Sequence, residues 1–538
     1  MSYLDVPRLH FAGTFMANPS TINNDSTNYD PALVNPPEIN PKNIGLVLAW
    51  NPYGSHAWTI SAQVTSFVDT SGTLHTSGDP LIGASLASYT PPQQSVAKLV
   101  DLDTEQQGVT RLFGLNLQLT MGSTTAALQG LWENGGTLIN LWFSRAPTGK
   151  GDSAAGGAFQ SVLQNPQWAT GGSSKLLQQL QNASGSGLSV RFSVFGYQDN
   201  NTSSSFRIGS IMGTIGPQLA GEPLHLPPRL LVPSSAQSPL AWAPAKVNSQ
   251  LNLVTIDLGN SIQDQNPGGP PANIGTLEAA VLSGAAPTSL GTVDYQGPTS
   301  TFAQTAGVVQ FPISSEQAGQ PLAILVNGTP QLAEGPTGLY VDVDGASVYM
   351  NPGDKTAPNL WATTFGAPAV NMPLIVELVP NSGNNQPTSA LSFPAVVTTG
   401  ANGSVPIPLG ASNPSPLPSG RQNIGGQLYF LGGSWAAGNG GPAPLTVKLF
   451  NSIDPPITQP TWTNVQPILF KYYYLYAYMA SIVDLSNYAS VKSSAQAIQS
   501  VLSLPFDDPS YMPVTREMSN DETQLILTWI ANGCPPGS

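Results

Sequence analysis

Alternation of apolar and polar residues dominates most of this 538-residue chain. The segments at 110–121 (TRLFGLNLQLTM) and 187–198 (GLSVRFSVFGYQ) follow it closely, which is typical of β-strands. Asp344-Gly345 stands between two alternating runs and indicates a hairpin turn. The spacing of short strands favours antiparallel, sandwich-like regions over a parallel α/β sheet. We therefore expect a mainly β fold, with further strands at 2–13, 45–50, 56–69, 97–103, 136–145, 251–259, 321–328, 374–380, 426–433 and 445–450.

A helical pattern replaces this alternation near the C-terminal end. We expect three helices, at 466–484, 488–503 and 519–532. Pro467 suits a first helical turn, where a missing N–H costs nothing. Helices of this length are marginal alone, so the block should pack on the β regions and give the fold a minor α+β character.

The last helix carries the sharpest boundary signals in the sequence. Ser519 and Glu522 have the spacing of a capping box ahead of a run of apolar residues. Gly533 follows where a helix end favours a left-handed residue, and Pro535 comes soon after it. These residues predict a helix that begins next to Ser519 and ends just before Gly533.

A short helical insertion is expected inside the first β region. Apolar residues recur at spacings near 3.6 in 155–169 and again in 174–184. Together with the proline-rich segment at 223–233, this pattern divides the chain. The predicted domains are a β-rich domain at 1–240 with its helical insertion at 155–184, a second sandwich-like domain at 241–460, and the helical block at 461–538.

Composition narrows the classes of partner. Only 9% of the residues are charged and the net charge is −13, with 17 Lys and Arg and no cluster of them. Duplex binding needs clustered cations that displace counterions. We therefore expect no nucleic-acid partner, and no membrane partner because no apolar run is long enough to span a bilayer.

The single cysteine, Cys534, allows no intrachain disulfide and no thiolate metal site within one chain. The first residues (MSYLDVPRLHFAG) lack the basic and continuous apolar parts of a signal peptide. We therefore expect an acidic, cytoplasmic protein, and its composition allows a homo-oligomer.

Two histidines in predicted strands are the candidate metal ligands of this sequence. His10 and His56 lie in predicted strands and are candidate catalytic or metal-binding residues if they converge. The alternative is that both bond to backbone groups in the core or at an edge. No HExxH or ExxH spacing occurs, and neither a dinucleotide-binding nor a P-loop motif is present.

The tyrosine-rich stretch at 472–478 suggests an aromatic wall. Tyr472, Tyr473 and Tyr476, with Trp58, are candidates to line a site for a planar ligand. Each buried hydroxyl there needs a hydrogen-bond partner. The alternative is a helix clamped between domains.

Arg8, Arg516 and Glu517 are further candidates for catalysis. Arg516 and Glu517 directly precede the capped helix. Their structural alternative is an ion pair that ties the helical block to the β body, and a structural role is equally open to Arg8.

The two ends of the chain, MSYLDVPRLHFAGTF (1–15) and SYMPVTREMS (510–519), resemble the amino-terminal portion of the imine-dimerising enzymes of bisindole biosynthesis. That family includes the violacein-pathway imine dimer synthase and the rebeccamycin-pathway chromopyrrolate synthase. Weaker similarities follow in the expected order, at 20–25, 54–58, 79–86, 97–103, 222–233 and 468–479. The resemblance implies a related fold and a place in oxidative secondary metabolism.

In that family a ferritin-like helical domain follows this portion, and iron or haem is implicated in coupling aromatic imines. This sequence ends at Ser538 without such a domain. The resemblance therefore implies a stand-alone module that binds an aromatic small molecule or a partner protein, such as a ferritin-like subunit. None of the matching positions is a known catalytic residue of the family, so the reaction itself is not carried over.

Two other function classes stay open. One is a metal-dependent oxidoreductase that uses His10 and His56 and acts on a substrate derived from an aromatic amino acid. The other is a lectin-like or self-assembling β-sandwich, which abundant Asn, Gln, Ser and Thr would suit. The sequence names no ligand and no reaction.

Overall fold

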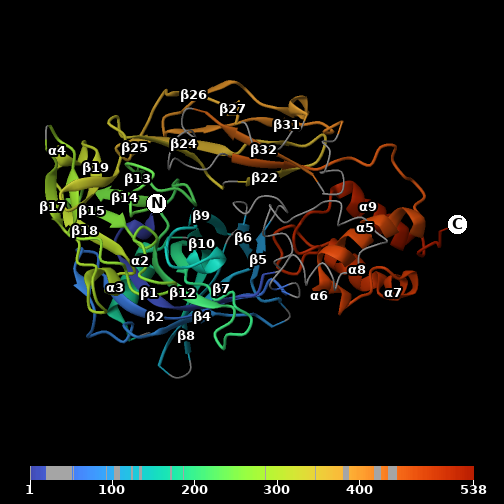
Figure 1. Cartoon of the computed structure of the whole chain (residues 1–538), viewed down its shortest axis with the longest axis horizontal. Coiled ribbons are helices and arrows are strands. Elements are labelled where there is room, and N and C mark those ends of the chain that lie inside the picture. Colours follow the sequence, from blue (N-terminus) through green and yellow to red (C-terminus); the bar gives the residue numbers. More distant parts are fainter. Residues whose placement is uncertain are drawn as a thin grey trace.

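The structure is a computed structural model in which the β regions gather on one side and the helical block lies at the opposite end (Figure 1). It describes residues 2–537 except 20–50, 52–53, 93, 102–109, 123–124, 133–135, 170–172, 186, 285, 346, 380–386, 417–425 and 434–444. The strand expected at 45–50 lies outside the described residues. The predicted fold class, mainly antiparallel β with helices at the C-terminal end, is confirmed.

The first region is a sheet that closes on itself. Eight strands follow one another in the order β11, β12, β1, β2, β4, β7, β8 and β10, and β10 also pairs with β11. Every pairing around this ring is antiparallel. The strands are β1 (Arg8–Ala17), β2 (Trp58–Val68), β4 (Ser85–Ser88), β7 (Asn116–Met121), β8 (Thr125–Trp132), β10 (Gly156–Trp168), β11 (Gly187–Phe195) and β12 (Ile208–Pro217).

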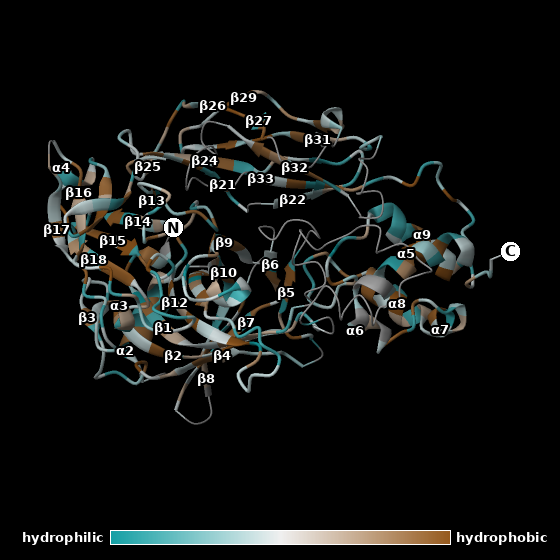
Figure 2. Ribbon diagram, in the orientation of Figure 1, coloured by the Kyte–Doolittle hydropathy of each residue, from teal (hydrophilic) through white to brown (hydrophobic). Residues whose placement is uncertain are grey.

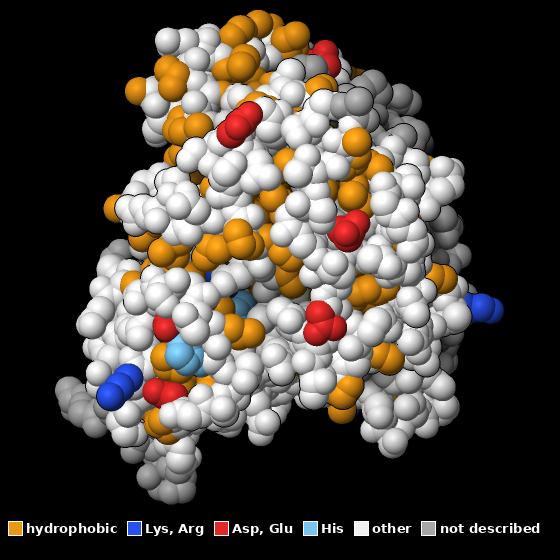
Figure 3. Space-filling model, turned by 90° about the vertical axis from the view of Figure 1, so that its left-hand side faces the viewer, with side chains coloured by type: hydrophobic (Ala, Val, Ile, Leu, Met, Phe, Trp, Pro, Cys, Tyr) orange, Lys and Arg blue, Asp and Glu red, His pale blue; other side chains and the backbone are white. Residues whose placement is uncertain are grey.

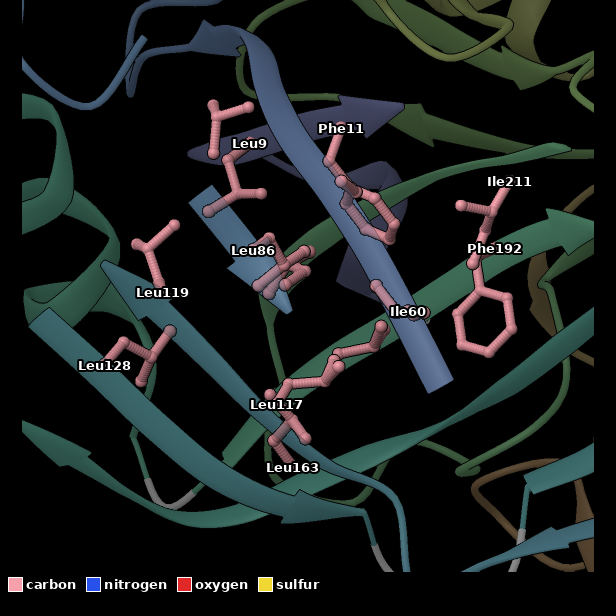
Figure 4. Packing of buried hydrophobic residues seen from close by; sticks show 14 of the residues in the cluster. Leu9, Phe11, Ile60, Leu86, Leu117, Leu119, Leu128, Leu163, Phe192 and Ile211 are labelled. Atoms are coloured by element: carbon pink, nitrogen blue, oxygen red, sulfur yellow. The ribbon is translucent and has the colours of Figure 1, made fainter. Parts of the chain in front are cut away.

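Alternation along these strands sends one set of side chains into the interior of the closed sheet. Figure 4 shows that all eight strands contribute apolar residues to this interior. Phe11 and Phe192 are fully buried there, as are the leucines of β7. The aromatic rings pack closely, and the Phe192 ring centroid lies 4.9 Å from that of Trp132. The closed sheet therefore has a complete apolar core of its own.

Four further strands and one helix surround the ring. β9 pairs with β10, β6 with β9, and β5 with β6, so these three extend the sheet beside one end of the ring, while β3 pairs with β2. The helix α2 buries three leucines against the same core. These elements are β3 (Leu74–His75), β5 (Lys98–Asp101), β6 (Thr110–Phe113), β9 (Gly136–Trp142), α2 (Lys175–Ala183) and the single 3-10 turns η1 (Ser2–Leu4) and η4 (Gly151–Ala154).

The prediction of a helical insertion at 155–184 is confirmed in its second half and wrong in its first. The helix expected at 174–184 is α2, with Ser174 as its N-cap. The helix expected at 155–169 is instead the strand β10. Residues 156–163 are all buried, so both faces of this part of β10 are covered, and β11 and β9 pair with its two edges. A short run buried on both faces does not show a period that separates strand from helix.

A second sheet follows, with its own apolar cluster. Its strands are ordered β17, β16, β19, β20, β13, β14, β15 and β18, all antiparallel. They are β13 (Arg229–Pro233), β14 (Ala243–Asn248), β15 (Leu253–Asp257), β16 (Leu277–Val281), β17 (Thr288–Thr292), β18 (Val308–Pro312), β19 (Leu322–Val326) and β20 (Thr329–Ala333), with short helices α3 (Thr301–Gln304) and α4 (Ser315–Ala318). β13 thus belongs to this sheet although it precedes residue 241.

The third β region consists of four small sheets around a separate cluster of buried residues. The pairing of β22 with β33 is parallel, while the others are antiparallel. Its elements are β21 (Leu339–Val343), β22 (Ser347–Met350), β23 (Lys355–Thr356), β24 (Asn359–Thr364), β25 (Ala367–Pro368), β26 (Pro373–Ile375), β27 (Glu377–Leu378), η5 (Thr388–Ala390), β28 (Leu391–Ser392), β29 (Val396–Thr398), β30 (Ser404–Pro406), β31 (Leu409–Ala411), β32 (Gln427–Gly432) and β33 (Leu445–Leu449). Residues 241–460, expected as one sandwich-like domain, therefore hold two large, separate apolar clusters.

The helical block contains five helices in its described part: α5 (Trp462–Leu475), α6 (Ala477–Ala480), α7 (Tyr488–Ser493), α8 (Ala495–Leu502) and α9 (Asn520–Ala531). α9 confirms the predicted boundaries: Ser519 and Glu522 form the capping box, and Gly533 has a positive φ. The two longer helices expected before it are each broken. Pro467 lies inside α5 and not in its first turn, because that helix begins four residues earlier than expected.

Figure 2 shows hydrophilic and hydrophobic residues on the same helices of the block, as expected for helices with one buried side. In Figure 3, charged side chains are few and scattered over the visible face, in line with the low charge of the sequence. No helix in the described part of the chain is long and apolar enough to cross a membrane.

Candidate functional site

Two cavities meet at His56. The larger, here called the strand-end cavity, has a volume of about 170 Å³ and lies where β1 ends and β10 and β11 meet. The smaller, here called the tyrosine cavity, has a volume of about 110 Å³ and lies between the helical block and the segment before β2. His56 lines both. Its position makes this junction the strongest candidate site in the described residues.

Backbone contacts fix the imidazole of His56. Its amide N–H donates to the Asn18 carbonyl at 2.7 Å, and its carbonyl accepts from the Leu99 N–H at 2.9 Å. Its Nδ1 lies 3.1 Å from the Leu99 carbonyl. Because a carbonyl only accepts, Nδ1 carries the proton, and Nε2 is left as the acceptor nitrogen. The positive φ of 60° at His56 is a conformation that L-residues adopt only where the surroundings enforce it.

The imidazole is neutral near pH 7. Burial lowers the pKa of His56 to about 4, and the positive charges of Lys98 and Arg516 lower it further against the opposing effect of the Leu99 carbonyl. A neutral, oriented imidazole can accept a hydrogen bond or a proton at Nε2. It is not a cation that would attract an anionic ligand.

Two of the predicted tyrosines reach this site. Tyr472 and Tyr476 line the tyrosine cavity, and their rings stack at 6.4 Å. The Tyr476 ring approaches His56 edge-on at 6.3 Å, and its hydroxyl donates to Oε2 of the buried Glu517 at 3.0 Å. The chain leaves helical geometry at Tyr476, which explains why the helix expected at 466–484 is broken there.

Two buried hydroxyls of the tyrosine cavity have no hydrogen-bond partner among the described residues. They are the Tyr472 hydroxyl and Thr515 Oγ1. Burial raises the pKa of Tyr472 well above its usual value, and the nearby Glu522 and Glu517 carboxylates raise it further. A buried hydroxyl without a partner destabilises the fold by about 1–3 kcal/mol. Such groups often mark the position of a ligand or water.

The remaining candidates from the tyrosine pattern lie apart from this cavity. Tyr473 packs against the apolar cluster of the block. Trp58 lies inside the closed sheet, where its ring stacks on those of Phe15 and Phe192 at 5.9 and 5.5 Å. The predicted aromatic wall thus comprises Tyr472 and Tyr476 without Tyr473 or Trp58. The side chain of Tyr474 is outside the described part.

Arg516 has a structural role. Its guanidinium donates to the carbonyls of Phe506, Val514 and Asp508, and it lies 4.0 Å over the ring of Phe113 in β6. Burial lowers its pKa to about 10. Arg516 therefore ties the helical block to the closed-sheet region by a cation–π contact. Glu517 shares the block with it and contributes to the site through Tyr476.

His10 and Arg8 lie far from His56. His10 is paired with Ser66 across β1 and β2, whereas His56 bonds to Asn18 beyond the other end of β1. At about 3.3 Å per residue, the eight positions from His10 to Asn18 span roughly 26 Å. His10 Nδ1 bonds to Thr214 Oγ1 at 2.8 Å, and Arg8 donates to the Leu4 and Asp5 carbonyls and to Gln310. The two histidines, which were candidates for one site only if they converged, are not brought together.

The distance between His10 and His56 bears on whether these residues can bind the iron or haem that the resemblance implies. A shared metal centre needs its ligands around one point, and His10 and His56 cannot supply it together. Within the described ranges, no group of three or more His, Cys, Asp or Glu side chains is placed to hold a metal ion. The residues expected to hold a metal therefore do not fit one, and no chemical step is derived through it.

Sequence reasoning missed the acidic side of the strand-end cavity. Asp152, in η4, lines this cavity, and Asp199 lies close enough to repel it. Tyr197 lines it as well and donates its hydroxyl to the Ala17 carbonyl at 2.8 Å. No motif marks Asp152, which stands among Gly, Ser and Ala residues. Only the closure of the sheet brings these three residues together.

No model of a known protein family matches this chain, and no curated protein matches its sequence significantly. The resemblance to the bisindole-pathway enzymes therefore stays a prediction, as does the lectin-like alternative, whereas a metal-dependent oxidoreductase cannot rest on His10 and His56 together.

Proposed function

We propose that this protein binds a small aromatic molecule in the tyrosine cavity. The observation that carries the proposal is the pair of buried hydroxyls, from Tyr472 and Thr515, that have no described partner beside an apolar cavity. The similarity of both chain ends to enzymes of aromatic imine coupling supports an aromatic ligand.

The size and lining of the cavity suit one aromatic ring. An apolar cavity of about 150 Å³ in another protein holds benzene, and this one measures about 110 Å³. Met479, Met512 and Met518 contribute to the wall. Methionine side chains adapt their shape and make favourable sulfur contacts with aromatic rings.

Polar groups at one side would orient the ring. Nε2 of His56 is an acceptor, so it suits the hydroxyl of a phenol or the N–H of a pyrrole ring. The Tyr472 and Thr515 hydroxyls can donate to an acceptor on the ligand. The ligand class is therefore a single-ring phenol or a compact N-heteroaromatic compound.

Titration calorimetry with phenol and pyrrole tests the proposal. For ligands of this size we expect a Kd of roughly 0.1–1 mM, with one site per chain. Leu502→Trp fills the cavity from α8 and should abolish this binding. Ile482→Trp, at an exposed position of the same block, is the matched control and should leave it unchanged.

Two results would overturn this function. One is the absence of saturable binding of both probes at millimolar concentration to folded protein. The other is unchanged binding in a folded Leu502→Trp variant.

A further inference from the structure

The strand-end cavity is distinct from the tyrosine cavity except at His56. Its wall is mostly aromatic and aliphatic, with Phe15, Phe159 and Phe195 from three strands of the closed sheet. Phe143 also lines it and is 50% exposed, so this ring stands at the open side of the cavity. The cavity volume of about 170 Å³ exceeds that of cavities known to hold benzene.

Asp152 places a carboxylate without a described partner in this mostly apolar wall. Asp152 lines the cavity, and no hydrogen bond or ion pair to its carboxylate is made by any other described residue. Burial raises the pKa of Asp152 to about 6, and the charge of Asp199 raises it further. No cation among the described residues offsets these effects. A desolvated carboxylate of this kind is stabilised when a positive charge approaches it.

The other polar groups facing Asp152 do not supply that charge. Asp101 is a second carboxylate of the wall, and no Lys or Arg is among the lining residues. Tyr197 donates its hydroxyl to the Ala17 carbonyl, and burial raises its pKa well above the usual value against the lowering effect of Arg207, so it stays neutral. His56 is neutral near pH 7 because its pKa is about 4. All formal charge on the wall near neutral pH is therefore negative.

We propose that the strand-end cavity binds a protonated primary amine that carries one aromatic ring, with the Asp152 carboxylate as its counter-ion. The apolar rings take up the body of the ligand, and the exposed Phe143 covers it at the open side. The ammonium group provides the three donors that the Asp152 and Asp101 carboxylates can accept. This site is independent of the aromatic-ligand function proposed for the tyrosine cavity.

Titration calorimetry with three probes of one shape tests the charge requirement. They are 2-phenylethylamine, neutral 2-phenylethanol and anionic 3-phenylpropionate. At about pH 7.5 we expect the amine to bind at least about tenfold more tightly than the alcohol, and we expect the acid not to bind. The reason is that attraction between two close opposite charges in a partly buried site lowers the dissociation constant at least about tenfold. This comparison uses the unaltered protein and needs no variant.

Asp152→Asn tests the residue. It should reduce the affinity for the amine at least about tenfold and leave the affinity for the alcohol unchanged. Glu377→Gln removes the same charge at an exposed position of β27 and should change neither. The substitution replaces a destabilised charge, so folding is expected to survive, and circular dichroism checks it.

A pH series gives a second readout. Asp152 becomes protonated as the pH falls below about 6, while the amine stays charged. Amine binding should therefore weaken about tenfold between about pH 7.5 and pH 5, whereas alcohol binding should not change. In Asp152→Asn the dependence on pH should disappear.

Equal affinity of the unaltered protein for amine and alcohol would overturn the proposal. So would undiminished amine binding in folded Asp152→Asn. Leu502→Trp separates the two cavities, because it should abolish phenol binding and leave phenylethylamine binding intact. If phenol binding fails while amine binding holds, only the function of the tyrosine cavity is lost.

Discussion

The closed sheet and the helical block both bury many aromatic side chains, yet they pack them differently. At the centre of the sheet, Phe192 has the rings of Trp58, Trp132 and Phe159 within 5.6 Å. In the block, Tyr472 and Tyr476 leave a cavity of about 110 Å³ beside them. Continuous antiparallel ladders fix every strand of the ring, whereas short helices joined by irregular segments fix the block. The interior of the ring is filled around Phe192 and its cavity lies at the strand ends, whereas the cavity of the block lies beside its own helices.

Removal of the Phe192 side chain from the centre of the closed sheet should have the largest effect on the free energy of unfolding. Phe192→Ala leaves a void among three aromatic neighbours, and such changes lower the free energy of unfolding by about 3–5 kcal/mol. Urea denaturation followed by tryptophan fluorescence measures it. Phe143→Ala, at the 50% exposed position, should change the same quantity by less than about 1 kcal/mol. Similar losses at both positions would contradict the contrast drawn between a filled core and a cavity rim.

The attachment of the block to the sheet should be next in size. Arg516→Lys loses the planar group that bonds three carbonyls and lies over Phe113. We expect the free energy of unfolding to fall by about 2–3 kcal/mol, because lysine cannot satisfy carbonyls in that geometry. Hydrogen exchange should show faster opening of the segment around Arg516 than of β1. Lys355→Arg on exposed β23 is the control and should change stability by less than about 0.5 kcal/mol. Equal exchange in variant and parent protein would show that the guanidinium does not hold the block in place.

The two stacked tyrosines should respond with opposite signs. Tyr476→Phe breaks the hydrogen bond to buried Glu517, so stability should fall by about 2 kcal/mol. Tyr472→Phe removes a buried hydroxyl without a described partner, so stability should rise by about 1 kcal/mol while phenol affinity falls. Thermal and urea denaturation of both variants measure the pair. Destabilisation of equal size in both would show that the Tyr472 hydroxyl is satisfied in solution.

The sequence predicted elements best where local chemistry decides the conformation. The alternation at 187–198 predicted a strand that β11 confirms, while the one strand expected at 110–121 is two strands, β6 and β7. The Ser519–Glu522 box and Gly533 predicted the ends of α9 because caps depend on neighbours within one turn. The prediction was wrong at β10. Its first eight residues are all buried, so no alternation of apolar and polar residues distinguishes this strand from a helix.

The candidate site was harder to predict. His56, Tyr472 and Tyr476 were all named from the sequence, and the structure places them together at the tyrosine cavity. The hypothesis of one site formed by His10 and His56 is wrong. His10 lies near the start of β1, whereas His56 bonds to Asn18 just after the end of that strand. Asp152 was missed because nothing near it in the sequence marks it as functional.

The sequence by itself determined the mainly β character, the capped last helix and the low charge of the surface, because each depends on residue type and spacing over a few positions. The tertiary structure decided that the first sheet closes, that His56 faces two cavities and that Asp152 lines an apolar cavity with no described cation beside it. The physical reason is that a strand pattern with a period of two fixes which face is buried, but not which strands meet. Closure of the ring sets those neighbours, and with them the chemistry of the site.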